Sequence, residues 1–191
     1  TLIKGLLRQL RARLTTRHER GVTMVVTVPQ ARFSSSSSLA AAHASAAPSA
    51  ASKGAPLPPD EEARIAALDA SNILDTAPEE MFDDIARLAS HLCGTPIALV
   101  SFVDRGRQWF KSAVGLSVSE TSRDVAFCAH AILEPWHTLE VTDSHVDPRF
   151  RDNPLVNGDP HVRFYAGAPI VSESGHALGT VCVIDHVPRA L

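Results

Sequence analysis

The segment over residues 123–133 holds the side chains best suited to chemistry in this chain. Phe127, Cys128 and His130 fall within four positions, and mostly apolar residues follow them. A helix with this sequence that crossed a sheet would press these side chains against it, and a buried thiol and imidazole would need polar partners. The segment therefore predicts either a wall of a ligand pocket or an ordinary core helix.

Aromatic and polar side chains elsewhere complete a candidate small-molecule site, since such sites combine an apolar cage with a few convergent polar atoms. These further candidates are Trp109, Phe110, Asp143, Arg149, Phe150, Asn153, Phe164 and Tyr165. Arg149 and Arg163 could hold an anionic ligand through forked hydrogen bonds. Either arginine could equally pair with Asp147 or Asp152. In the alternative interpretation the aromatic residues are core and the polar ones fix loop geometry.

The cysteines do not indicate a metal site or a disulfide framework. There are three of them, Cys93, Cys128 and Cys182, with no CxxC pair. Cys128 and His130 are two positions apart, so on a helix they point to different sides and are poorly placed to share a metal with His137 or His145. We therefore predict reduced thiols and no metal, and the sequence indicates no particular cofactor.

Charge is unevenly distributed along the 191 residues. The formal net charge is −3, but residues 1–59 carry eight Lys/Arg and one acid, whereas residues 60–191 carry ten Lys/Arg and twenty acids. An acidic domain is a poor match for a nucleic-acid partner. No apolar run approaches the roughly 20 residues that a membrane-spanning helix needs, so no membrane span is predicted.

Residues 1–59 are predicted to be a disordered tail, a linker or a transit-like segment. Residues 1–14 have a basic amphipathic helix pattern, and a Ser run at 34–38 leads into an Ala/Ser/Pro tract. The Arg-rich, Ser-rich composition is also typical of an organelle transit peptide, with Met24 as an alternative start. Cytoplasmic localisation is the main prediction, and organelle targeting is the alternative.

Residues 60–191 show the signals of an α+β domain. Asp60 is the expected N-cap of a helix over 61–71, and a capping box at 76–79 is expected to start a second helix that ends at Gly94. Helical structure is also predicted over 123–133, near 154–156, and from Pro188, where a C-terminal helix is cut short. Strands are predicted over 97–103, 107–114, 138–143, 162–171 and 176–185, with a bulge at Gly167.

Alternation along the predicted strand 107–114 divides its side chains between two faces. One face is predicted to carry Trp109, Lys111 and Ala113, and the other Gln108, Phe110 and Ser112.

Six segments, in this order and spacing, resemble the GAF domain family. They are SNILDTAPEE at 71–80, PIALVSFVDRGRQWFKSAVGL at 96–116, AFCAHAIL at 126–133, VTDSHVDPRFRDNPLV at 141–156, VRFYAGAPI at 162–170 and HALGTVCVID at 176–185. The likeness covers about residues 60–191 and is strongest to the sensor modules of bacterial histidine kinases and diguanylate cyclases.

The resemblance implies an α+β fold with an antiparallel sheet of five to six strands and flanking helices. It implies that helices on one face form a homodimer interface and that a small-molecule cavity lies on the other. It further implies a non-catalytic sensor in two-component or cyclic di-GMP signalling, coupled to an output kinase or cyclase domain in cis or in trans.

A cysteine-based redox enzyme of the free methionine sulfoxide reductase type is the alternative function. Cys128 resembles the position of one cysteine in that subfamily. The loop over 156–161 has no cysteine where the subfamily places its catalytic one, which weakens this alternative.

Overall fold

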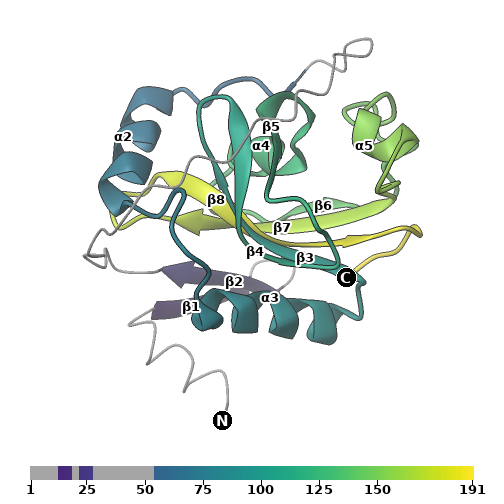
Figure 1. The fold of residues 1–191 in the computed structure, drawn as a ribbon, viewed down its shortest axis with the longest axis horizontal. Helices are drawn as coiled ribbons and strands as arrows, with labels where there is room; N and C mark the ends of the chain where they lie inside the picture. The colour runs from purple at the N-terminus through teal and green to yellow at the C-terminus, as the bar shows by residue number, and fades with distance from the viewer. Residues whose placement is uncertain (1–12, 19–21, 28–53) are drawn as a thin grey trace.

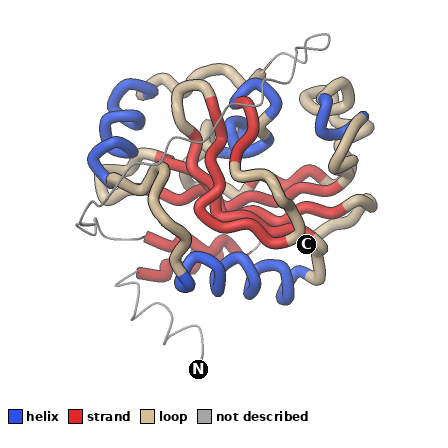
Figure 2. The backbone as a smooth tube through the Cα atoms, in the orientation of Figure 1, coloured by secondary structure: helices blue, strands red, loops and turns tan. Residues whose placement is uncertain are grey.

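The computed structural model describes residues 13–18, 22–27 and 54–191 (Figures 1 and 2). Its helices are α2 (Glu61–Ser71), α3 (Glu80–Cys93), the 3₁₀ turn η1 (Arg123–Val125), α4 (Phe127–Ala131) and α5 (Pro154–Asn157). Its strands are β1 (Arg13–His18), β2 (Val22–Thr27), β3 (Ile97–Val103), β4 (Arg107–Val114), β5 (Glu120–Ser122), β6 (Leu139–Val141), β7 (Phe164–Val171) and β8 (Ala177–Asp185).

Six strands form the antiparallel sheet that the sequence predicts. Their order is β6-β7-β8-β3-β4-β5, and every neighbouring pair is antiparallel. The α+β prediction is therefore confirmed. β3 and β4 have the predicted bounds because a continuous apolar run and an alternating run are joined by the turn residues of a tight hairpin.

A further hairpin, β1–β2, adds to this sheet through one parallel bridge between Thr27 and Val171. These strands are not among the predicted elements, because residues 1–59 are expected to be a disordered tail, a linker or a transit-like segment. The expectation of disorder is wrong for 13–18 and 22–27, whereas the linker and transit-like alternatives stay predictions. The Ser run and most of the Ala/Ser/Pro tract lie outside the described residues, as does the predicted helix over 1–14 except for its last two positions, which begin β1.

Helices cover both faces of the sheet. In Figure 1, α3 runs along one face, and α4 and α5 lie over the other. The α3-face core contains Leu68, Ile73, Phe82, Ala86, Val100, Phe102, Trp109 and Leu178, so α2 shares it with α3. The α4-face core includes Leu99, Phe110, Phe127, Cys128, Phe150, Tyr165 and Cys182.

The predicted alternation along β4 holds as far as Lys111 and then reverses. Phe110 and Ser112 pair with adjacent residues of β3, which leaves Lys111 as an extra residue on β4. Such a bulge moves every later side chain to the opposite face. Ser112 therefore lies on the α3 face, where it donates to Asp83 at 2.6 Å, and Ala113 packs against the α4-face core.

The prediction of a capping box is wrong, because residues 76–79 accept hydrogen bonds from Lys111 instead. α3 begins at Glu80, and no side chain caps it. The Lys111 ammonium donates to Thr76 Oγ1, the Ala77 carbonyl and Glu79 Oε1, each at 2.6 Å. A buried ammonium requires acceptors for its three protons, and this need determines the geometry of the segment before α3.

Other helix signals are confirmed in part. Gly94 adopts the left-handed conformation at the end of α3, with φ 61°. Asp60 is at the N-cap position of α2, but its carboxylate bonds to His176 at 2.6 Å rather than to the helix. The single helix expected over 123–133 is divided into η1 and α4. No helix follows Pro188 as far as Leu191.

Gly167 is not at a bulge, since the shift between β7 and β8 lies at Ile170–Val171. It accommodates the neighbouring tyrosine. A Cβ on Gly167 would lie 2.1 Å from the Tyr165 hydroxyl, which is closer than real Cβ contacts allow. The absence of a side chain therefore lets Tyr165 lie across the α4 face of β7.

Replacing Gly167 by alanine should displace Tyr165 and lower the free energy of unfolding by about 1–3 kcal/mol, the usual cost of overpacking. Urea unfolding followed by circular dichroism measures this. Gly106→Ala is the matched control, because nothing lies within 4 Å of its Cβ position. Equal unfolding midpoints for the two variants would contradict this role of Gly167.

Candidate functional site

A group of hydroxyl and thiol side chains is buried between α4 and three adjacent strands. Its members are Ser101 of β3, Cys128 of α4, Tyr165 of β7, and Thr180 and Cys182 of β8, each at most 1% exposed. We call this set the Cys128 cluster. Polar atoms so far from water need partners within the protein, so their mutual bonding decides what the cluster can do.

The hydroxyl groups of the cluster are directed at one sulfur. Thr180 Oγ1 lies 3.0 Å from Cys128 Sγ. The hydroxyls of Ser101 and Tyr165 each lie 3.3 Å from the same atom. The Cys182 sulfur is 3.8 Å away. Because each O–H group can donate, this arrangement stabilises negative charge on Cys128.

The pKa values of the two buried thiols are shifted in opposite directions. Burial acts to raise the pKa of Cys128, but the hydrogen bonds from Cys182 and the three hydroxyls outweigh it and lower the pKa below its usual range. The hydrogen bond to Cys128, together with burial, raises the pKa of Cys182 well above its usual value. The pair therefore combines a thiolate-forming sulfur with one that keeps its proton.

Aromatic side chains enclose this cluster on the α4 side. The rings of Phe127 and Phe150 stack with centroids 4.0 Å apart and an interplanar angle of 7°. Tyr165 is tilted against Phe127 at 5.2 Å, and the His130 ring meets Phe150 edge-on at 4.8 Å. Phe110 belongs to the same core. The structure thus brings together six of the predicted site residues: Phe110, Phe127, Cys128, His130, Phe150 and Tyr165.

His130 lies at the rim of this aromatic group and is half-buried. Burial and then the positive charge of Arg149 lower its pKa, so the imidazole is neutral at pH 7. A neutral imidazole can both donate and accept a hydrogen bond.

Two predicted site residues lie on the opposite face of the sheet. Trp109 belongs to the α3-face core, with its ring 6.5 Å from that of Phe102. Phe164 packs beneath α3 with Ala166 and Val183. Each of them is adjacent in the chain to a residue on the α4 face, and successive strand residues point to opposite faces. The prediction that Trp109 and Phe164 belong to the same site as Phe110 and Tyr165 is therefore wrong.

The predicted polar candidates form contacts within loops. Asp143 accepts from Arg163 at 2.9 and 3.0 Å, and Arg149 donates to Asp147 at 2.6 and 2.9 Å. Hydrogen bonds from the paired arginines lower the pKa of Asp143 and of Asp147.

Asn153 also supports a loop. Its side-chain oxygen caps α5, and its Nδ2 donates to the Val125 carbonyl at 3.0 Å. This bond ties α5 to the segment that leads into α4.

Three members of the Cys128 cluster, Ser101, Thr180 and Cys182, are not among the predicted site residues. A signal exists, because both hydroxyl residues interrupt runs of apolar strand residues. A hydroxyl in a fully buried strand needs a polar partner, and Cys128 is the partner that the sequence could have suggested.

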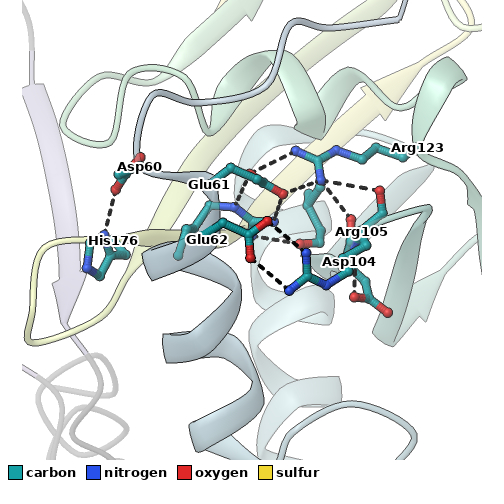
Figure 3. A network of polar contacts seen from close by, with 9 residues as sticks. Asp60, Glu61, Glu62, Asp104, Arg105, Arg123 and His176 are labelled. Atoms are coloured by element: carbon teal, nitrogen blue, oxygen red, sulfur yellow. Dashed lines mark hydrogen bonds and ion pairs between the residues drawn. The ribbon is translucent and has the colours of Figure 1, made fainter.

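An ionic network joins α2 to the sheet and to the segment before α4 (Figure 3). Glu61 accepts from Arg64 Nε and Nη2 at 2.9 Å each, and from Arg123 Nη2 at 3.2 Å. Arg64 also donates to the Val103 carbonyl at 2.7 Å, and Arg123 to the Asp104 carbonyl at 3.0 Å. One carboxylate therefore holds the first turn of α2, the end of β3 and η1 together.

The charge of Glu61 is strongly favoured in the folded protein. Burial acts to raise its pKa, but the hydrogen bonds and charges of Arg64 and Arg123 lower it to about 2. By contrast, the neighbouring pair of Glu62 with Arg105, at 3.0 Å, is exposed to solvent.

The comparisons with known proteins agree with this fold. A family model described as GAF domain matches residues 77–190. The chain belongs to the GAF domain family. A cyclic di-GMP phosphodiesterase of Pseudomonas aeruginosa is 47% identical to this GAF protein over 134 residues, which are 70% of this chain and 23% of the relative. The chain thus spans about a quarter of the length of that curated relative.

Solved structures are similar to this chain at low identity and with TM-scores below 0.5. A protein described as a GAF sensor from Burkholderia vietnamiensis is 18% identical, with a TM-score of 0.47, covering 69% of this chain and 77% of that structure. A free methionine-R-sulfoxide reductase from Neisseria meningitidis is 15% identical, with a TM-score of 0.48, covering 65% and 74%.

Two kinds of feature are absent from the residues of this GAF domain that the structure describes. Within that part of the chain, no group of three or more His, Cys, Asp or Glu side chains is arranged to hold a metal ion. None of the helices in the described residues is long and apolar enough to cross a membrane.

Replacing Glu61 by glutamine should lower the free energy of unfolding at pH 7 by about 3 kcal/mol, since two buried arginines lose their counter-charge. The pKa of Glu61 is about 2 in the folded protein against 4.5 ordinarily. The carboxylate thus stabilises the fold above pH 4.5, and this contribution fades as the pH falls toward 2. Urea unfolding of both proteins between pH 7 and pH 3 should show the difference shrinking.

Glu62→Gln is the control for this prediction, because that carboxylate is exposed. It should leave the unfolding midpoint nearly unchanged. A wild-type minus Glu61→Gln difference that stayed constant down to pH 3 would show that the charge of Glu61 is not responsible.

Proposed function

We propose that this GAF domain is a non-catalytic regulatory module that binds a small molecule at its α4 face and passes the signal to an output domain. The observation that carries the proposal is the convergence of buried polar atoms and aromatic rings from α4 and three strands. Small-molecule sites have this composition, with an apolar enclosure and few polar atoms that fix orientation. The ligand would contact Phe127, His130, Phe150 and Tyr165, and bond to the Cys128 cluster.

The proposed route of the signal runs through the ionic network. Arg123 lies in η1, immediately before α4, and its partner Glu61 lies in the first turn of α2. A ligand that moved α4 would move η1 and therefore change the position of the Glu61 carboxylate. Because that carboxylate is the counter-charge of two buried arginines, its displacement is costly unless α2 follows.

The proposed output is an enzyme of cyclic di-GMP turnover, acting in cis or in trans. The support is the 47% identity to a protein named as a cyclic di-GMP phosphodiesterase. Since the match covers 23% of that relative, its activity is assigned here to the output and not to the residues described above.

We further propose that the module works as a cytoplasmic homodimer that pairs through the outer side of α3. Leu92 is 66% exposed there, and Met81 and Ile85 are only partly buried. An exposed apolar side chain at the end of an amphipathic helix supports contact with a second copy.

A thermal-shift screen tests the ligand proposal, using free amino acids, short carboxylates and cyclic nucleotides that include cyclic di-GMP. At one hundred times its Kd, a true ligand should raise Tm by about 10 °C. Tyr165→Phe, which removes one hydroxyl of the cluster, should weaken binding about tenfold.

Ser112→Ala is the matched control, since it removes a buried hydroxyl on the α3 face. It should leave Kd unchanged. A screen without any hit, or an equal loss of affinity in both variants, would count against a site at the α4 face.

Hydrogen exchange with a compound from that screen tests the route to α2. In the wild type the compound should slow exchange in α4 and also in α2. Arg123→Lys keeps the charge but loses the forked geometry, so only α4 should respond. Arg105→Lys, altering the exposed pair with Glu62, should behave as the wild type. An unchanged α2 response in Arg123→Lys would exclude this route.

A further inference from the structure

Two of the three cysteines lie in contact inside the Cys128 cluster. Cys128 Sγ and Cys182 Sγ are 3.8 Å apart, and both residues are 1% exposed. We propose that Cys128 and Cys182 are a redox-active pair that a hydroperoxide converts to an intramolecular disulfide linking α4 to β8. This inference is independent of the small-molecule function proposed above.

The geometry needs only a modest movement of one element. A disulfide bond is about 2.05 Å long, so the sulfurs must approach by about 1.8 Å. Cys182 is held in the middle of the sheet, paired with Leu99 on β3 and Gly167 on β7. Cys128 is on a helix of five residues between η1 and a series of turns. A shift of α4 can therefore close the gap without breaking the sheet.

The surroundings give the two sulfurs different roles. Hydroxyls of Ser101, Tyr165 and Thr180 point at Cys128, and they stabilise the thiolate that attacks an oxidant. Cys182 is in contact with that sulfur and keeps its proton, so it is the resolving thiol. The lowered pKa of Cys128 and the raised pKa of Cys182 agree with this division.

The reaction balances with a hydroperoxide, ROOH, as the two-electron oxidant. The Cys128 thiolate attacks one peroxide oxygen, the O–O bond breaks, and RO⁻ leaves and takes up a proton as ROH. The resulting Cys128 sulfenic acid is attacked by the Cys182 sulfur, which gives up its proton. The S–O bond breaks as the S–S bond forms, and hydroxide leaves with that proton as water.

Access requires local opening, since both thiols are buried. Hydroperoxide reaches Cys128 when α4 lifts from the sheet, so the reaction should be faster in urea concentrations too low to unfold the domain. Cys93 provides an internal comparison. It is more exposed, lies at the end of α3 and packs on the opposite side of the sheet.

The test uses the full chain, fully reduced and then treated with hydrogen peroxide. Free thiols are alkylated after unfolding, and peptide mapping identifies the linked peptides. The expected product is a Cys128–Cys182 disulfide with Cys93 still alkylated, and dithiothreitol should reverse it. Cys93→Ser should form the same disulfide at the same rate. Cys182→Ser should form none and should accumulate a Cys128 sulfenic acid that dimedone traps.

The wild-type mapping decides the matter even if a cysteine variant fails to fold. Oxidation of Cys93 while Cys128 and Cys182 remain alkylatable would overturn the proposal. So would a disulfide that includes Cys93. A negative ligand screen would not bear on this result, because the readout is the covalent state of the sulfurs alone.

Discussion

The carboxylate of Glu61 joins α2 to the β3–β4 turn and to the segment that leads into α4. It is ion-paired with Arg64 from its own helix and with Arg123 from the segment that leads into α4. Each arginine also bonds to a main-chain carbonyl near the β3–β4 turn. Buried guanidinium groups are costly without a counter-charge, so this carboxylate requires α2, the hairpin turn and η1 to form together.

Most of the fold could be predicted because local signals and packing agree. The run at 97–103 and the alternating segment at 107–114 became β3 and β4 with the expected bounds. The predictions that were wrong concern residues whose positions depend on tertiary contacts. Lys111 is an extra residue in β4. Its ammonium donates to Thr76 and Glu79, two residues that fit the sequence pattern of a capping box. No local sequence pattern predicts that a distant lysine will donate hydrogen bonds to those oxygens.

The candidate site was predicted only in part, for a similar reason. The sequence identifies the aromatic residues of α4 and its neighbours as candidates. It does not show which of two adjacent residues on β4 or β7 points to the face that α4 covers. Phe110 and Tyr165 do, whereas Trp109 and Phe164 do not. The partners of Cys128 come from strands 27 to 54 positions away, so only the closed sheet places them. The hairpin β1–β2 was not predicted, because the Ser run and the Ala/Ser/Pro tract that follow it are typical of a disordered tail.

The hydroxyl pair Ser101–Thr180, 3.2 Å apart, has a consequence for how protons are distributed in the core. If both hydroxyls donate to Cys128, neither can donate to the other, and this pattern favours the deprotonated sulfur. When Cys128 carries its proton, one of its four polar neighbours, Ser101, Tyr165, Thr180 or Cys182, can accept it. Losing a single proton at α4 can therefore change the orientation of O–H groups on β3, β7 and β8 while the heavier atoms keep their places.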